Sequence, residues 1–152
     1  MKGKMLVTEA GRLAYYSNWV THDSWGLNTP RYAHSMIGYD DIDSGSYDLI
    51  VGHCDIGFLS DPHRPSGAVR SWENLCHTIA YYVKDKKYTI LLVPILMSNA
   101  GPSKPALACQ RYDIYALSPS YKDHDALRSL LKQRGAIDYS PKLNFTDDTV
   151  CV

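Results

Sequence analysis

Residues 47–97 restrict the fold more than any other part of the chain, because their hydrophobic pattern predicts a strand, a loop, a helix and a second strand. Residues 47–52 are a short apolar run, which is typical of a strand buried on both faces. From Val69 to Val83 the apolar residues recur at steps of three and four, which predicts a helix with one face on a sheet. Residues 88–97 predict a second buried strand. This order of elements predicts a βαβ unit with a right-handed crossover and parallel strands.

The length and charge of the chain favour one folded domain. With 152 residues the chain is long enough to bury a core, so we expect residues 1–152 to form a single α/β domain. The expected architecture is a short parallel Rossmann-like sheet flanked by helices. Hydrophobic residues make up 45% of the chain and sixteen basic residues balance sixteen acidic ones. This composition excludes a disordered chain and disfavours nonspecific nucleic-acid binding.

The segment before the central unit is harder to assign. Residues 4–8 and 12–20 on either side of a turn predict an N-terminal β-hairpin, and a short helix over residues 13–19 is the alternative. Residues 21–46 contain many turn-forming residues and are expected to be a long irregular connection, with a short helix near residues 32–37 as the alternative. Connections of this length inside a domain are often lids or binding loops.

The segment after the central unit has a clearer pattern. Residues 111–117 alternate in polarity and predict a third strand. Asp123 can cap a following helix, and Gly135 stands where a C-terminal glycine cap belongs. Residues 136–139 predict an edge strand.

Membrane and disulfide signals are both weak. The first residues are basic but lack the apolar run of a signal peptide, and the longest apolar run, residues 90–97, is too short to span a bilayer. We therefore expect a soluble cytoplasmic protein with no membrane partner. The cysteines have no repeated close spacing, so separate thiols are expected rather than a disulfide framework. They are Cys54, Cys76, Cys109 and Cys151.

The loop of residues 53–67 is the best candidate for a binding site, because ligands of open parallel sheets bind outside the carboxyl ends of the strands. Its last residues enter the helix, so backbone N–H groups and arginine side chains can converge there on an anion such as a phosphate. An ordinary helix cap with surface arginines is the alternative. The predicted ligand-binding residues are Asp55, Asp61, His63, Arg64, Ser66, Gly67 and Arg70.

Glu73 and His77 are the candidate catalytic residues. They are four residues apart and so share one side of the predicted helix, where Glu73 can act as nucleophile or base and His77 can orient it. A solvent-exposed ion pair is the alternative. The neighbouring histidines and cysteines fit no standard zinc spacing, and Walker and dinucleotide glycine patterns are absent, so no metal and no cofactor are predicted.

The central part of the chain resembles the nucleoside 2-deoxyribosyltransferase-like proteins. The resemblance depends on Ser66-Gly67 leading into Trp72-Glu73 on a helix, followed by the apolar strand of residues 89–95. It implies a small Rossmann-like domain in which a helix presents a glutamate that attacks or stabilises the sugar at an N-glycosidic bond. TIR-like NAD-cleaving domains share this layout. The resemblance thus implies a catalytic role for Glu73.

Two classes of function follow from the sequence. The first is a small enzyme that binds an anionic or nucleotide-like ligand and acts on a nucleotide, a nucleoside or a related phosphorylated molecule. The second is a non-catalytic interaction domain, viral or assembly-associated, because twelve tyrosines against two phenylalanines can provide contact surface. The sequence leaves open whether the chain binds a second copy of itself or another protein.

Overall fold

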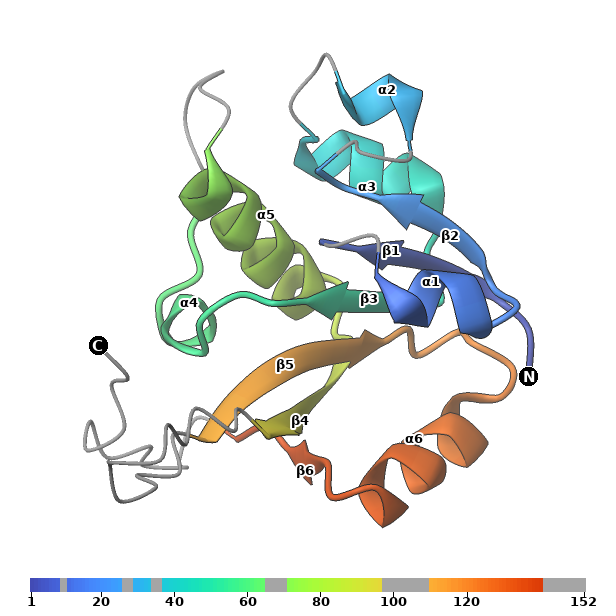
Figure 1. Cartoon of the computed structure of the whole chain (residues 1–152). Helices are drawn as coiled ribbons and strands as arrows, with labels where there is room; N and C mark the ends of the chain where they lie inside the picture. Colours follow the sequence, from blue (N-terminus) through green and yellow to red (C-terminus); the bar gives the residue numbers. More distant parts are fainter. Residues whose placement is uncertain (9–10, 26–28, 34–36, 65–70, 97–109, 141–152) are drawn as a thin grey trace, which may run out of the picture.

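The computed structural model describes residues 1–8, 11–25, 29–33, 37–64, 71–96 and 110–140, which form a six-stranded sheet with helices on both faces (Figure 1). The strands are β1 (Lys4–Val7), β2 (Val20–Asp23), β3 (Leu49–Gly52), β4 (Thr89–Leu96), β5 (Gln110–Leu117) and β6 (Ile137–Asp138). The helices are α1 (Arg12–Tyr16), α2 (Pro30–Ala33), α3 (Tyr39–Gly45), α4 (Gly57–Ser60), α5 (Trp72–Asp85) and α6 (His124–Gln133).

The sheet is mixed, which corrects the expectation of a short parallel sheet. Its strand order is β2-β1-β3-β5-β4-β6. β1 pairs in parallel with β2 and β3, whereas β5 lies antiparallel between β3 and β4. β3 and β4 therefore run in the same direction, as the βαβ pattern predicted, but they are not neighbours. The hydrophobic pattern fixes the direction of the crossover and does not reveal that a later strand fills the gap.

The prediction of an N-terminal β-hairpin is also wrong. β1 and β2 are parallel, with Lys4 opposite Val20 and Val7 opposite Asp23, and parallel neighbours need a crossover connection. α1 provides this crossover, in agreement with the short-helix alternative. Two further helices, α2 and α3, lie in the segment expected to be irregular.

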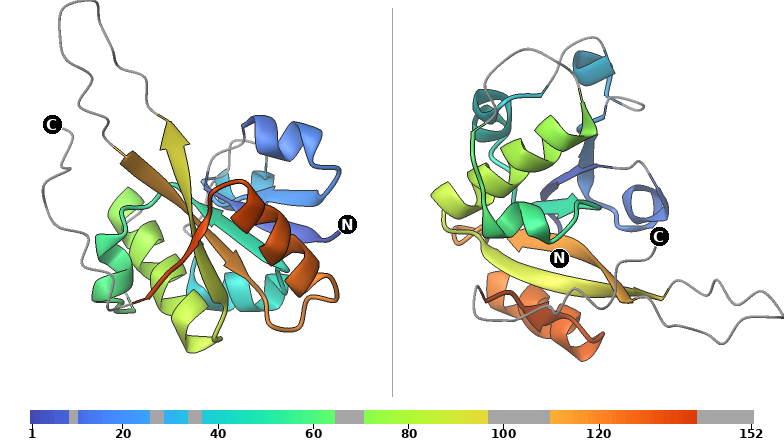
Figure 2. Two further views of the ribbon diagram at one scale, coloured as in Figure 1. Left: turned by 90° about the horizontal axis from the view of Figure 1, so that it is seen from below. Right: turned by 90° about the vertical axis from the view of Figure 1, so that its left-hand side faces the viewer.

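The core consists of two layers, one on each face of the sheet. Leu6, Ile50 and Leu92 pack against α5 and its neighbours, whereas Met5 and Val51 pack on the opposite face with residues of α6. Successive residues of β1 and β3 thus point into different layers, which explains why residues 5–7 and 49–51 are all apolar. Figure 2 shows α3, α4 and α5 on one side of the sheet and α1 and α6 on the other.

The predicted long helix is confirmed as α5. Ser71 caps it, since its hydroxyl accepts a hydrogen bond from the Asn74 backbone N–H at 3.1 Å. Cys76, Ile79 and Val83 are buried as the periodicity predicted. α6, the third strand (β5) and the edge strand (β6) are confirmed too. Within the described residues no helix has the length and apolar character needed to cross a membrane.

Candidate functional site

The carboxyl ends of β1, β2 and β3 meet at one edge of the sheet, and the loop after β3 leads from this edge to α5 (Figure 1). Thr8 and Ser24 follow β1 and β2 there and are buried. The Ser24 backbone N–H donates to Val7 O at 2.8 Å, so the two strand ends are tied together. The rings of Trp25 and Trp72 pack edge to face, with centroids 5.6 Å apart, and join the segment after β2 to the first turn of α5.

Three of the predicted residues come together at the beginning of α5. Glu73 Oε1 lies 3.9 Å from His77 Nε2, and the ring of His63 packs on the ring of His77 with centroids 3.7 Å apart. Phe58 of α4 contacts the other part of the His77 ring at 4.6 Å between centroids. The Glu73 side chain is 75% exposed, whereas that of His77 is 14% exposed. The cluster therefore presents a carboxylate to solvent in front of a largely buried imidazole.

The other nitrogen of His77 has no partner among the described residues. His77 Nδ1 is buried and makes no hydrogen bond. A buried polar atom without a partner costs about 1–3 kcal/mol, so the fold tolerates an unfavourable arrangement at this point. A catalytic role is one explanation for an unsatisfied polar group of this kind.

The remaining predicted ligand-binding residues are dispersed. Arg64 lies over the ring of Tyr39, 5.0 Å from its centroid, and its Nη2 is 3.7 Å from Asp40 Oδ1. The Asp55 carboxylate accepts a hydrogen bond from the Gly57 backbone N–H at 2.7 Å and so supports the start of α4. Asp61 is exposed at the end of α4. Ser66, Gly67 and Arg70 lie outside the described residues.

Cys54 and Cys76 form a disulfide, which corrects the expectation of separate thiols. Cys54 follows β3 and Cys76 lies in the second turn of α5, and their Cα atoms are 5.6 Å apart, within the range that a disulfide spans. The 22-residue separation hides this proximity in the sequence. Cys109 and Cys151 are outside the described residues.

A His–Asp pair at the same edge was missed by the sequence interpretation. His53 Nδ1 is hydrogen-bonded to Asp113 Oδ1 across β3 and β5. The His53 backbone N–H donates to Thr8 Oγ1 at 3.0 Å. The Asp113 side chain is 13% exposed. Asp113 is an acidic residue in the middle of β5, which was the available signal, but its partner is 60 residues away. The two side chains lie on the sheet face opposite Cys54, because Asp113 alternates with the buried Ile114.

A cavity of ≈ 250 Å³ opens at the opposite edge of the sheet, near the end of α5. Among its lining residues are Asp43, Tyr82, Lys86 and Tyr88. Lys86 Nζ pairs with Asp43 Oδ1 at 2.8 Å, which raises the pKa of the lysine. Burial, and then the neighbouring Tyr88, raise the pKa of the Tyr82 hydroxyl far above its ordinary value. No predicted ligand-binding residue lines this cavity.

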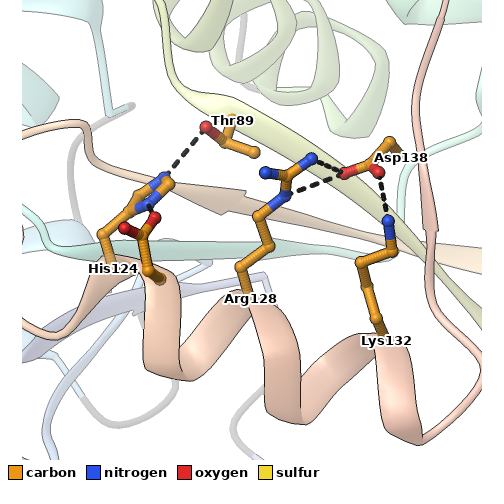
Figure 3. A network of polar contacts seen from close by, with 6 residues as sticks. Thr89, His124, Arg128, Lys132 and Asp138 are labelled. Atoms are coloured by element: carbon orange, nitrogen blue, oxygen red, sulfur yellow. Dashed lines mark hydrogen bonds and ion pairs between the residues drawn. The ribbon is translucent and has the colours of Figure 1, made fainter.

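A polar network joins α6 to the edge of the sheet (Figure 3). His124 Nε2 is 2.9 Å from Thr89 Oγ1 at the start of β4. Arg128 and Lys132 both bind Asp138 of β6, at 2.8 and 2.6 Å. Hydrogen bonds from Lys132 and then from Arg128 lower the pKa of the Asp138 carboxyl. This network ties α6 to β4 and β6.

Comparison with known proteins assigns the chain to a family. Among the described residues, no group of three or more His, Cys, Asp or Glu side chains is arranged to hold a metal ion. Searches of the curated proteins and of the solved structures found no match. One family model, described as Domain of unknown function (DUF8728), matches residues 2–115, a range that contains Glu73, His77 and both half-cystines. Because the match covers most of its length, the chain belongs to this DUF8728 family.

Proposed function

We propose that the chain is a small enzyme that acts on a nucleotide, a nucleoside or a related phosphorylated small molecule, with Glu73 as nucleophile or base. The observation that supports this most is the convergence of Glu73, His77 and His63 at the start of α5. This convergence lies beside the carboxyl ends of the parallel strands, where open α/β sheets bind their ligands.

The chemistry follows from the positions of the two candidate catalytic side chains. The exposed Glu73 carboxylate can reach a substrate, and His77 Nε2 behind it can hold the carboxylate in one orientation. We propose cleavage of an N-glycosidic bond as the reaction. The carboxylate attacks the sugar carbon, the electrons of the C–N bond pass to the departing base, and the base takes up a proton. Water then releases the sugar from Glu73.

Two features favour a nucleotide-like ligand. Trp72 is next to Glu73 and only partly buried, so its ring can stack on a base. The Arg64 side chain is 58% exposed, and its guanidinium can bind a phosphate once it leaves its contacts with Tyr39 and Asp40. Ser66, Gly67 and Arg70 remain sequence predictions for the same role.

Substitution of Glu73 tests the proposal directly. We expect Glu73→Gln to lower kcat/KM for base release from nucleosides or nucleotides by at least about 100-fold, because the amide is neither nucleophile nor base. Free base is measured by chromatography across a panel of nucleosides and their 5′-monophosphates. Asp125→Asn is the matched control, because Asp125 is also an exposed acid in the first turn of a helix and next to a histidine.

Full turnover by Glu73→Gln contradicts the proposal. So does an equal loss in Asp125→Asn, since this would show that any change of charge at a helix start is sufficient. Thermal unfolding of both variants shows whether the fold is intact.

A second candidate function has its own supporting observation. The side chains of Tyr15 and Tyr16 on α1 are 82% and 76% exposed, and Val20 at the start of the edge strand β2 is 62% exposed. Exposed aromatic residues beside an edge strand are typical of protein-binding surfaces. If the chain is an interaction domain, Glu73→Gln is without effect and the double substitution Tyr15→Ser, Tyr16→Ser abolishes binding to its partner.

A further inference from the structure

The Cys54–Cys76 disulfide closes the segment that carries the candidate site. Cys54 comes two residues after the end of β3, and Cys76 is on α5. The described site residues Asp55, Asp61, His63, Arg64 and Glu73 all lie between the two half-cystines.

The bond also fixes the candidate catalytic residues against the sheet. Cys76 is adjacent to His77 and three residues after Glu73, so one covalent link holds the first turns of α5 beside the end of β3. The Cα atoms of His53 and His77 are no more than about 13 Å apart, since the half-cystine Cα atoms are 5.6 Å apart and each histidine adds one step of about 3.8 Å.

The first part of the closed segment, residues 55–64, is attached to the rest of the fold through side chains such as Phe58 and His63, which pack on His77. Its backbone hydrogen bonds join neighbouring residues, from Phe58 N–H to Asp55 O at 3.2 Å and from Leu59 N–H to Ile56 O at 2.9 Å. Its main anchor in the core is Leu59, which is fully buried. Without the disulfide this segment has neither a strand nor a long helix of its own to fix it.

We propose that the Cys54–Cys76 disulfide is a redox-controlled clamp that holds residues 55–64 and the Glu73–His77 pair in the arrangement that binds ligand. The effect on ligand binding rests on the proposed function, whereas the clamp itself does not. Oxidation assembles the site, and reduction releases the segment while the rest of the sheet stays folded.

The redox step is a two-electron thiol–disulfide exchange with a dithiol reductant. A thiolate of the dithiol attacks one sulfur of the cystine, the S–S bond breaks, and the other sulfur leaves as a thiolate that takes up a proton. The second thiol of the reductant then attacks the mixed disulfide and releases the second cysteine. The cystine gains two electrons and two protons, and the dithiol becomes a disulfide. Because Cys54 is 3% and Cys76 0% exposed, attack requires the segment to open first.

Hydrogen exchange of the full chain tests the clamp. The oxidised protein is compared with protein reduced by dithiothreitol, and exchange is followed in residues 55–64 with α6 as internal reference. We expect exchange in residues 55–64 to be about tenfold faster after reduction and exchange in α6 to be unchanged. Mass spectrometry of the denatured, non-reduced protein should recover the peptides of Cys54 and Cys76 joined.

Variants and ligands complete the test. Cys54→Ser with Cys76→Ser should exchange as the reduced protein does under oxidising conditions, and Cys109→Ser with Cys151→Ser, which removes the same number of thiols, should keep the redox response. If the double variant does not fold, the comparison of the oxidised and reduced forms of the unmodified chain still shows whether the disulfide holds residues 55–64. Thermal shift with each nucleoside 5′-monophosphate should be larger for the oxidised form.

The clamp is overturned if Cys54 and Cys76 are alkylated without prior reduction, or if exchange in residues 55–64 is the same in both redox states. Equal nucleotide-induced shifts in both states overturn redox control and leave the proposed function standing. If no nucleotide shifts the thermal unfolding of either redox state, the proposed function is contradicted. The difference in hydrogen exchange between the two states still shows whether the clamp exists.

Discussion

Gly45, the last residue of α3, illustrates how closely single residues are fitted around the core. A Cβ atom at this position would lie 2.2 Å from the ring of Tyr47. That ring cannot move away easily, because Tyr47 is 1% exposed and its hydroxyl is 2.8 Å from His22 Nδ1 and 3.3 Å from the hydroxyl of Tyr32. The glycine is therefore required by packing, although alanine is the better helix former.

Gly45→Ala should destabilise the protein. Overpacking against a buried ring costs about 1–3 kcal/mol, which exceeds the gain of about 1 kcal/mol in helix propensity. Urea unfolding measures the free-energy difference. Gly11→Ala is the control, since no atom of the described residues, its chain neighbours and its own helix aside, lies within 4 Å of a Cβ at that position. Its unfolding midpoint should stay close to that of the unchanged chain. Equal stability of Gly45→Ala and Gly11→Ala would show that the Tyr47 ring is not fixed as described.

The residue scale also shows where sequence interpretation succeeds and fails. Glu73 and His77 were placed on one side of a helix by their spacing, because helix geometry is local. The Cys54–Cys76 bond and the His53–Asp113 pair were not found, because tertiary packing alone brings these residues together. Which residues far apart in the sequence come into contact depends on the order and direction of the strands. The pattern of a single sequence does not give this order.

At the scale of elements, α6 is held to the sheet largely by its polar side. Of its predicted apolar residues, Leu127 is buried, but Leu130 is 40% exposed. Asp138 of β6 accepts hydrogen bonds from Arg128 and Lys132. These ion pairs fix the short edge strand against the helix.

Asp138→Asn should make this attachment weaker and less dependent on pH. The pKa of Asp138 is lowered in the folded chain, so its contribution to stability is present above its ordinary pKa of 3.8 and is lost as the pH falls through the lower folded value. At pH 7 we expect a loss of about 1 kcal/mol, because the pairs are partly exposed. The difference between the two proteins should shrink below pH 4. Chemical denaturation at several pH values measures it.

The exposed Asp61 provides the control for this series. Asp61→Asn should leave the free energy of unfolding unchanged at pH 7, since this side chain is exposed at the end of α4. A constant difference between Asp138→Asn and the unchanged chain from pH 7 to pH 3 would contradict the assigned role of the carboxylate.

Elements with strong periodicity were predicted well, and their arrangement was not. α5, α6 and β5 follow from apolar spacing, which acts within the element, and Gly135 has the positive φ expected of a C-terminal glycine cap. The predicted cap Asp123 precedes α6, but its side chain makes no capping hydrogen bond. The mistaken hairpin came from reading residues 12–20 as a strand, although Arg12–Tyr16 is helical and only Val20–Asp23 pairs with β1. Short elements rich in aromatic residues fit both patterns, and the parallel pairing decides between them.

At the scale of the molecule, the disulfide connects the two halves of the crossover unit. Loss of a cross-link that closes a segment of 22 residues is expected to cost about 3 kcal/mol, mainly through the freedom regained by the unfolded chain. We expect this loss in Cys54→Ser with Cys76→Ser and not in Cys109→Ser with Cys151→Ser. Urea unfolding under oxidising conditions measures both. Equal midpoints would mean that the bond is not formed in solution.

Although the sheet is mixed, the candidate site still lies at the carboxyl ends of parallel strands. Insertion of β5 between β3 and β4 changes their neighbours but not their direction, so β1, β2 and β3 still end at the edge that leads to α5. The correct part of the prediction, the direction of the crossover, is the part on which the candidate site depends. A disulfide is more typical of proteins in oxidising compartments, and the cytoplasmic location expected from the sequence stays a prediction.

The position of the bound ligand tests the central claim most directly. Carbon-13 labelling of the histidine rings gives separate signals for His63, His77 and His124, and the chain is titrated with each nucleoside 5′-monophosphate. The account predicts that the signals of His63 and His77 shift together, because both lie behind Glu73. The signal of His124, which lies on α6 and is hydrogen-bonded to Thr89 of β4, should not move. A shift of His124 with His63 and His77 unchanged, or no shift in any of the three rings, would contradict it.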